Sequence, residues 1–146
     1  MNKGQTIIYV SKDDEYIGYY SVSDTIKESS KNAIEILKKK GKRIILLTGD
    51  NAKSASYFGS LVGIDEIISE VKPEDKLNVI SNLQKEGLKV AMVGDGINDS
   101  PSLIKSDVGI AIGAGSDIAI DSASIILIKS DLMDVVKSME LSKKVK

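Results

Sequence analysis

The stretch "AMVGDGINDS", Ala91–Ser100, decides how this sequence folds, because a short apolar run passes directly into a pair of acids. The apolar Ala91–Val93 is typical of the end of a buried strand, and Asp95 and Asp99 follow it within one glycine-rich turn. Loops at the carboxyl ends of parallel strands form the ligand crevice in open α/β sheets. We therefore expect the two carboxylates at that edge of a parallel sheet.

The composition of the chain limits the chemistry available to this turn. The 146 residues are 42% hydrophobic and 28% charged, which fits one ordinary globular domain with a buried core. The formal net charge of −1 argues against a nucleic-acid partner. There is no cysteine and no histidine, so disulfides, imidazole ligands and Ser-His-Asp catalysis are excluded. No apolar run approaches the ~18 residues of a membrane span, so we expect a soluble, cytoplasmic chain.

The pattern outside the turn alternates between strands and helices. Thr6–Val10 and Tyr16–Val22 predict a β-hairpin around the charged turn Ser11–Glu15. Further strands are expected at 43–47, 67–68, 89–93, 108–112 and 124–128, and helices at 29–40, 52–61, 73–87, 101–104, 117–120 and from 132. The sequence predicts an α/β fold, a three-layer Rossmann-like sandwich with a mainly parallel sheet, in residues 23–146. The hairpin, residues 1–22, is expected to be a separate unit.

The loop "TGDN", Thr48–Asn51, follows directly after the strand 43–47. Thr48 offers a hydroxyl, Gly49 lets the backbone approach a ligand, and amides at the next helix start can face an anion. Alternatively, the loop is an ordinary turn in which Asp50 or Asn51 caps that helix.

The segment "KPEDK", Lys72–Lys76, places Pro73 at the first position of a helix. Lys76 then falls in the first turn, where a cation is mildly unfavourable beside the positive end of the helix dipole. An anionic ligand in the crevice would reverse that sign. The alternative interpretation is a solvated surface lysine.

The acids Asp95 and Asp99 suit a hard cation. Mg²⁺ takes oxygen ligands and usually only one or two protein carboxylates, with water and phosphate oxygens completing its shell. Without a cation the two charges would repel each other, although both acids can also serve as helix caps. Together the three loops offer a hydroxyl, an ammonium and a carboxylate pair, which can bind a phosphoryl group with its Mg²⁺.

The motifs "TGDN", "KPEDK" and "GDGINDSPSL", in this order, resemble the phosphorylation domain of P-type ATPases, within the haloacid dehalogenase-like superfamily. The resemblance covers the chain from about Tyr16 onward, and 23–29 and 106–128 look most like the heavy-metal-transporting branch, copper pumps especially. It implies a haloacid dehalogenase-type fold. For the whole protein it implies ATP-driven cation transport through an aspartyl phosphate, with Mg²⁺ and ATP as cofactors.

The resemblance also implies roles for individual residues. Thr48 would hydrogen-bond the phosphoryl oxygens and Lys76 would neutralise them. Asp95 would coordinate Mg²⁺ directly, Asp99 would hold it through water or orient its neighbours, and Asn98 would help position the phosphoryl group.

Two further positions carry weaker implications. Asp24 resembles an acid that braces the "TGDN" loop. Gly113 and Gly115 either allow close packing of the backbone or form a structural turn.

The sequence departs from the family in one important respect. It contains no D-K-T-G-T motif, whose aspartate is the nucleophile of the family. Most of the nucleotide-binding domain is absent as well, with 1–22 resembling its last hairpin, and so are the transmembrane helices. We therefore expect the chain to be inactive alone and to need a partner, either the remainder of a membrane ATPase or another strand-supplying chain.

The missing nucleophile strand would lie between the strands 43–47 and 89–93 in this superfamily. An open slot there would leave backbone groups unpaired. We expect the two flanking strands to close on each other, or the hairpin or a strand of another chain to fill the gap. Two other functions stay open, namely a non-catalytic regulatory or binding module and a small phosphatase of the same superfamily.

Overall fold

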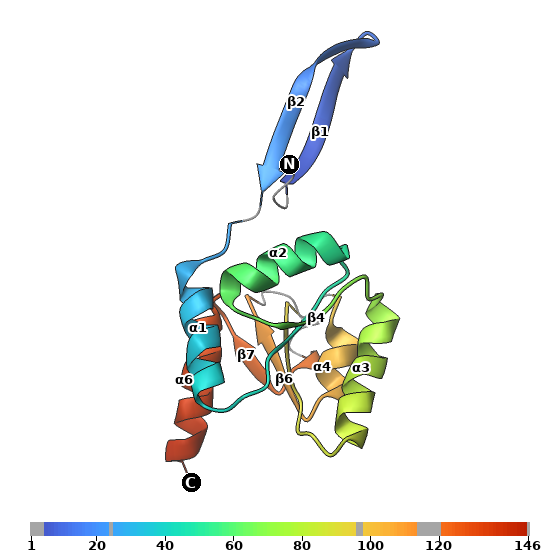
Figure 1. The fold of residues 1–146 in the computed structure, drawn as a ribbon. Helices are drawn as coiled ribbons and strands as arrows, with labels where there is room; N and C mark the ends of the chain where they lie inside the picture. The colour runs from blue at the N-terminus through green and yellow to red at the C-terminus, as the bar shows by residue number, and fades with distance from the viewer. Residues whose placement is uncertain (1–4, 24, 96–97, 114–120, 146) are drawn as a thin grey trace.

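The computed structural model describes residues 5–23, 25–95, 98–113 and 121–145 (Figure 1). Three of the predictions above, concerning Asp24, Gly115 and a helix at 117–120, lie outside these ranges. The elements follow in the order β1 (Gln5–Lys12), β2 (Glu15–Ser23), α1 (Glu28–Lys39), β3 (Ile45–Leu47), α2 (Ala52–Val62), β4 (Glu66–Ile68), α3 (Pro73–Lys85), β5 (Ala91–Gly94), α4 (Ser100–Lys105), β6 (Val108–Ile112), β7 (Ile125–Leu127) and α6 (Leu132–Lys144).

The hairpin β1–β2 extends away from the rest of the molecule (Figure 1). Its turn is shorter than the predicted five residues, because Asp13 and Asp14 both adopt positive φ angles, of 49° and 62°. Two successive left-handed residues make a tight two-residue turn that matches the twist of the strands. The antiparallel register pairs Tyr9 with Tyr19 and Ile8 with Tyr20.

The body of the molecule is the predicted α/β layer structure. All strand pairs in it are parallel: β3 pairs with β4, β5 with β6, and β6 with β7. Figure 1 shows α1 and α6 together on one side of these strands and α3 and α4 on the other. Two apolar clusters lie in the body. One, of Ala33, Leu37 and Val136, joins α1 to α6, and the other, of Leu103 and Ala111, joins α4 to β6.

A glycine with a positive φ angle lies just beyond the end of three helices. Gly63, which closes α2, has a φ of 78°, and Gly41 and Gly87 beyond α1 and α3 have φ angles of 72° and 84°. A left-handed residue at this place lets the chain turn out of the helix and satisfy its last carbonyl groups. These turns return the chain to the amino ends of β3 and β5, which makes the strands parallel.

The parallel strands form two sheets. The described strands order as β3–β4 and as β5–β6–β7, with no pairing between β3 and β5. The expectation that these two strands close on each other is therefore wrong, and so is the expectation that the hairpin fills the gap, because β1 and β2 pair only with each other. Two strands stay side by side only where a ladder of hydrogen bonds joins them. The loops and helices that connect the strands do not force β3 against β5, so the place of the missing strand is not taken.

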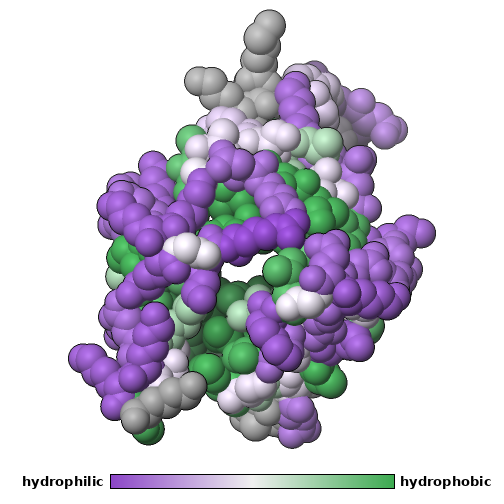
Figure 2. Space-filling view, turned by 60° about the horizontal axis from the view of Figure 1, so that its bottom comes forward, coloured by the Kyte–Doolittle hydropathy of each residue, from purple (hydrophilic) through white to green (hydrophobic). Residues whose placement is uncertain are grey.

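The consequence of the split sheet is incomplete burial. The side chains of Ile45, Leu46 and Leu47 in β3 are only half-buried, and so are Met92 and Val93 in β5. The inner strand β6, by contrast, buries Gly109–Ala111 completely. The space-filling view shows an opening in the middle of the body, with hydrophilic residues along its upper edge and hydrophobic residues below it (Figure 2). Strands in a parallel sheet covered by helices are normally buried on both faces, so β3 and β5 present two unfilled edges.

Candidate phosphate and cation site

The loop after β3 is organised around Thr48. Its hydroxyl accepts a hydrogen bond of 3.1 Å from the backbone N–H of Asp50 and donates one of 3.1 Å to Asp50 Oδ2. The next residue, Asn51, is the N-cap of α2, because its Oδ1 accepts a hydrogen bond of 2.9 Å from the N–H of Ser54. The structure therefore confirms that Asn51 caps α2. Asp50, the other candidate for the cap, lies with Thr48 at the end of β3.

The same loop is fastened to the segment that leads into α3. The N–H of Val71 donates to Thr48 O at 3.1 Å, and the N–H of Glu70 donates to Asp50 O at 2.9 Å. Glu70 has a φ of 57°, a left-handed conformation that non-glycine residues adopt rarely. Gly49 lies against Val71, whose O would be 3.4 Å from a Cβ placed on that glycine. The backbone therefore holds the first loop beside the start of α3.

Lys76 connects this region to the acids after β5. Its Nζ donates a hydrogen bond of 2.7 Å to Asp99 Oδ1, and the two side chains are only 14% and 15% exposed. The alternative interpretation of Lys76 as a solvated surface lysine is therefore wrong. The lysine does lie beside an anion, but that anion is the carboxylate of Asp99 and not a ligand.

Asp99 sits close against the backbone at the end of β5. A Cβ placed on Gly94 would lie 2.5 Å from Asp99 Oδ2 and 2.9 Å from Asp99 Cβ, closer than real atoms approach. Gly94 is itself buried, and Asp95, the next residue, is exposed. Asn98 is also exposed, and the two residues between Asp95 and Asn98 lie outside the described ranges.

The contacts form a continuous series across three loops. Thr48 bonds to Val71, Val71 leads into α3 and Lys76, and Lys76 bonds to Asp99, which rests on Gly94. All three loops follow the carboxyl ends of parallel strands, which is where α/β sheets bind ligands. The structure thus brings together Lys76 with Asp99, and connects the Thr48 loop to them through backbone contacts.

The donor set fits Mg²⁺ in its chemistry. Asp95 and Asp99 offer oxygen ligands and, counted together, match the one or two carboxylates that Mg²⁺ usually takes from a protein. Within the described ranges no group of three or more acidic, histidine or cysteine side chains could hold a metal. A cation here would therefore depend on water and on phosphate oxygens for most of its shell.

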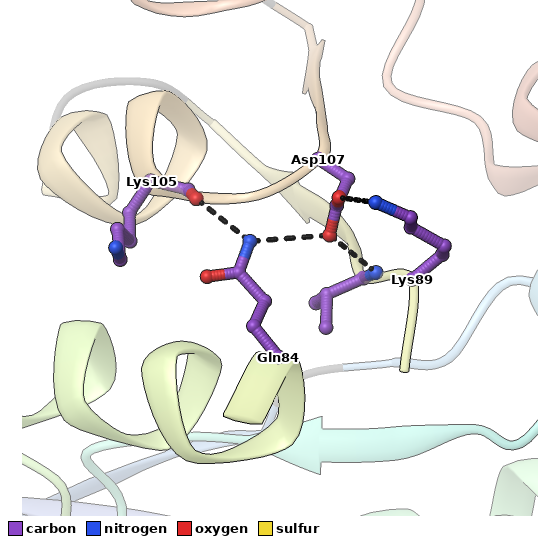
Figure 3. Close-up of polar contacts among 5 residues, drawn as sticks. Gln84, Lys89, Lys105 and Asp107 are labelled. Atoms are coloured by element: carbon purple, nitrogen blue, oxygen red, sulfur yellow. Dashed lines mark hydrogen bonds and ion pairs between the residues drawn. The ribbon is translucent and has the colours of Figure 1, made fainter. Parts of the chain in front are cut away.

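A second polar cluster lies at the opposite ends of the same strands (Figure 3). Asp107, just before β6, accepts hydrogen bonds from Lys89 Nζ at 2.8 Å, from the N–H of Val90 at 3.0 Å and from Gln84 Nε2 at 3.1 Å. The bond from Lys89 is the largest of several contacts that hold the pKa of Asp107 well below its usual range. Sequence reasoning missed this cluster, which ties α3 to the starts of β5 and β6.

The sequence profile of a known family matches most of the chain. The profile described as haloacid dehalogenase-like hydrolase matches residues 2–107. The chain belongs to this family of hydrolases, as its layers and its strand-end loops indicate.

Copper-transporting P-type ATPases are among the proteins that are similar to this chain. The chain is 49% identical over 142 residues to copper-transporting ATPase 1 of Mus musculus, 53% identical over 140 residues to a probable copper-transporting ATPase of Arabidopsis thaliana, and 45% identical over 141 residues to a probable copper-importing P-type ATPase of Enterococcus hirae. These matches cover 95–97% of the chain but only 10%, 14% and 19% of the relatives' own lengths. The segment is part of a much longer protein in each relative.

Solved structures agree with this placement. The chain is similar to a crystal structure of a zinc-transporting PIB-type ATPase, with a TM-score of 0.83 and 34% identity over 97% of this chain and 23% of that one. It is also similar to the structure of a catalytic CPx-ATPase domain, CopB-B, with a TM-score of 0.68 over 86% of this chain and 50% of that one. No helix in the described part of the chain is long and apolar enough to cross a membrane.

Proposed function

We propose that this chain supplies the phosphate-binding and Mg²⁺-binding loops of a copper-transporting P-type ATPase. In the whole protein, ATP would drive cation transport through an aspartyl phosphate. The names and the identity of the relatives support the transport function. The observation that carries the proposal is the contact of Lys76 with Asp99 at the carboxyl ends of the strands. This contact puts an ammonium group and a carboxylate, the groups expected to bind phosphate and Mg²⁺, beside the Thr48 loop.

Each proposed role follows from the chemistry of the side chain. The Thr48 hydroxyl and the backbone at Gly49 would bind phosphoryl oxygens, with Asp50 holding the hydroxyl in place until they arrive. Lys76 would neutralise the phosphoryl charge. Preorganised donors aimed at a transferring phosphoryl group are most of what phosphoryl transfer requires of a protein.

The cation would be held at the end of β5. Asp95 would coordinate Mg²⁺ directly, Asp99 would hold it through water or orient its neighbours, and Asn98 would help position the phosphoryl group. Bound Mg²⁺ would supply neutralisation of phosphate charge. The buried position of Gly94 beneath Asp99 supports this arrangement, since it lets the carboxylate approach the strand end.

The unfilled edges of β3 and β5 support a partner strand. Unpaired N–H and C=O groups and half-buried apolar side chains together are a template for a further strand. An apolar strand that ends in the D-K-T-G-T motif, inserted there, would bring its aspartate to the carboxyl ends of the strands, beside Lys76. The source of this strand would be the remainder of the ATPase.

The hairpin supports a second domain. Both of its faces carry exposed apolar side chains: Tyr9 is 70% exposed on one face, beside Tyr16 and Tyr19, and Tyr20 is 69% exposed on the other, beside Ile8. A hairpin of two strands is marginally stable in water unless something covers it. Residues 1–22 would belong to the nucleotide-binding domain, which holds ATP, while 23–146 form the phosphorylation domain. Both would lie on the cytoplasmic side of the membrane.

A peptide that supplies the missing strand tests the proposal. The peptide has a short apolar run followed by D-K-T-G-T and a fluorescent label, and its binding to the purified chain is followed by anisotropy with and without Mg²⁺. We expect saturable binding, and a higher Mg²⁺ affinity of the complex than of the chain alone. A peptide with Asn in place of the motif's Asp should bind but not raise the Mg²⁺ affinity.

Two outcomes would contradict the proposal. Binding of a scrambled peptide as tightly as the designed one would show that no strand site exists. Hydrolysis of ATP or of an aryl phosphate by the chain alone would show that it contains its own nucleophile, as the small phosphatase would.

A further inference from the structure

The short helix α4 rests directly on one residue of the inner strand. A Cβ placed on Gly109 of β6 would lie 2.5 Å from Leu103 O, 3.0 Å from Leu103 C and 3.2 Å from Leu103 Cα. These are backbone atoms of the helix, so no side-chain rotation can relieve the clash. Leu103 is also 1% exposed, and its O already accepts a hydrogen bond from Ser106 Oγ at 2.8 Å. Any side chain at position 109 must therefore move the helix itself.

Asp99 directly precedes the same helix. Asp99 is its N-cap, and the N–H of Leu103 donates to Asp99 O at 2.9 Å, which is the first hydrogen bond of the helix. The backbone atoms that rest on Gly109 are thus one helical turn from the acid that meets Lys76. A shift of α4 away from β6 carries Asp99 with it, because the helix has only six residues and one turn cannot absorb the displacement.

Asp99 has little tolerance for such a shift. Its carboxylate lies over Gly94 on one side and bonds to Lys76 at 2.7 Å on the other. Gly94 and Gly109 lie on the neighbouring parallel strands β5 and β6, where Gly94 pairs with Ala111 and Gly109 pairs with Met92. Because neither glycine has a side chain, the Asp99 carboxylate can lie close against Gly94 and α4 can lie close against Gly109. We call these two contacts together the seat of Asp99.

We propose that Gly109 is a positioning residue for Asp99, and that the seat it makes with Gly94 sets how closely the Asp99 carboxylate approaches the end of β5. This rests on the proposed function, in which Asp95 and Asp99 face a cation there. Mg²⁺ demands short and regular coordination, whereas Ca²⁺ accepts longer distances and more ligands. The seat would thus favour the smaller ion, although Gly109 touches neither the ion nor the acid.

The test compares Gly109→Ala with Gly59→Ala. Gly59 is a matched control, because a Cβ there would press on the side chain of Ile67 and the backbone of Ile64, far along the chain from the acids. Affinities for Mg²⁺ alone and for Ca²⁺ alone are measured by calorimetry on the full chain. We expect Gly109→Ala to lower Mg²⁺ affinity by about tenfold to a hundredfold and Ca²⁺ affinity by a smaller factor. Gly59→Ala should lower stability and leave the ratio of the two affinities unchanged.

A merely structural role of Gly109 predicts a different result. Loss of folded protein lowers both affinities by the same factor, so an unchanged ratio in Gly109→Ala would overturn the inference. If Gly109→Ala does not fold, Gly94→Ala takes its place, since the three atoms nearest to its added Cβ all belong to the Asp99 side chain, and it should shift the ratio in the same direction. An unchanged ratio in that variant would overturn the inference equally.

A third variant separates this inference from the proposed function. Asp95→Asn must abolish most Mg²⁺ binding if the acids form the site. Loss in Asp95→Asn with an unchanged ratio in Gly109→Ala would leave the proposed function standing and remove the role of Gly109. Mg²⁺ affinity that survives in Asp95→Asn would overturn both.

Discussion

Lys76 and Asp99 neutralise each other across the site, with 2.7 Å between Lys76 Nζ and Asp99 Oδ1 and little exposure of either side chain. The two residues come from the first turn of α3 and from the start of α4. A cation and a phosphate would each have to compete with this ion pair. Binding of one should therefore ease binding of the other, because the metal would release Lys76 and the phosphate would occupy it.

Replacing Lys76 separates its effects on the two ligands. In Lys76→Gln we expect Mg²⁺ to bind about tenfold more tightly, because the Lys76 ammonium no longer competes for Asp99. A tenfold change in affinity corresponds to about 1.4 kcal/mol of binding free energy. Phosphate should bind more weakly, since its counter-charge is gone as well. The free energy of unfolding without metal should fall by about 1–3 kcal/mol, because a partly buried carboxylate loses its partner.

Calorimetry with Mg²⁺ and with inorganic phosphate, together with urea denaturation, measures these effects. Lys72→Gln is the matched control, because Lys72 is exposed at the N-cap of the same helix and should change neither affinity much. Equal weakening of both ligands in Lys76→Gln would contradict the competition.

Replacing Asp95 tests the cation site with the fold intact. Asp95 is exposed, so Asp95→Asn should leave the free energy of unfolding within about 0.5 kcal/mol of the original value. Mg²⁺ affinity should fall by at least about tenfold. Replacing a residue that only supports the metal ligands usually costs about tenfold or more in affinity, and replacing a direct ligand should cost no less. Asp65→Asn, which removes another exposed acid, is the control. Unchanged affinity by calorimetry would count against the assigned site.

The stability of the fold should depend on pH through Asp107. The hydrogen bond from Lys89, followed by those from the Val90 N–H and Gln84, lowers the pKa of this carboxyl group in the folded state. A lowered folded pKa stabilises the fold above the unfolded pKa of about 3.9, and this contribution is lost as the pH falls below that value. We expect Asp107→Asn to be less stable at neutral pH and to lose less stability on acidification.

Urea denaturation from neutral pH down to about pH 2.5, below the unfolded pKa, measures this slope. Lys89→Met should reduce the slope only in part, because the Val90 and Gln84 bonds remain. The slope left in Asp107→Asn comes from other acids whose pKa values are also lowered, namely Glu35, Glu66, Asp131 and Glu140. An identical slope in Asp107→Asn and the original chain would rule out the assignment.

The cap of α2 offers a stability test next to the phosphate loop. Asn51 Oδ1 accepts the N–H of Ser54, and Asn51→Ala should lower the free energy of unfolding by about 1 kcal/mol. Asn78→Ala, within α3 and exposed, is the control and should be neutral or slightly stabilising, because alanine is the better helix former. A loss in Asn78→Ala as large as that in Asn51→Ala would mean that the cap contributes nothing of its own.

Most of the fold could be predicted because its signals are local. Glycines 41, 63 and 87 mark helix ends, Pro73 marks a helix start, and β6 at Val108–Ile112 was predicted to the residue. These signals depend on backbone preferences of single residues or on apolar runs, which are visible in the sequence alone. The boundaries of β3 and β5 were predicted less well, since their ends lack such markers and their partner strand is missing.

The contacts within the site could not be predicted in the same way. Asp99 and Lys76 are 23 residues apart, and no periodic pattern records that two side chains meet after the chain has folded. The pairing of Asp107 with Lys89 is of the same kind. The left-handed conformation of Glu70 also has no signal, because glutamate rarely adopts it. Family resemblance supplied the residue types, and the structure supplied their partners.

The split between β3 and β5 also decides which part of the chain is the most rigid. Only β6 has strand partners on both sides among the described residues, so slow exchange of amide hydrogens with solvent should centre on β6 and weaken toward β3 and β5. In an unbroken sheet β3 and β5 would lie in the middle and should be the most protected from hydrogen exchange. In this chain they are among the most open strands. A strand bound between β3 and β5 would move the slowest-exchanging amides to the middle of the molecule, next to the groups that we propose bind phosphate.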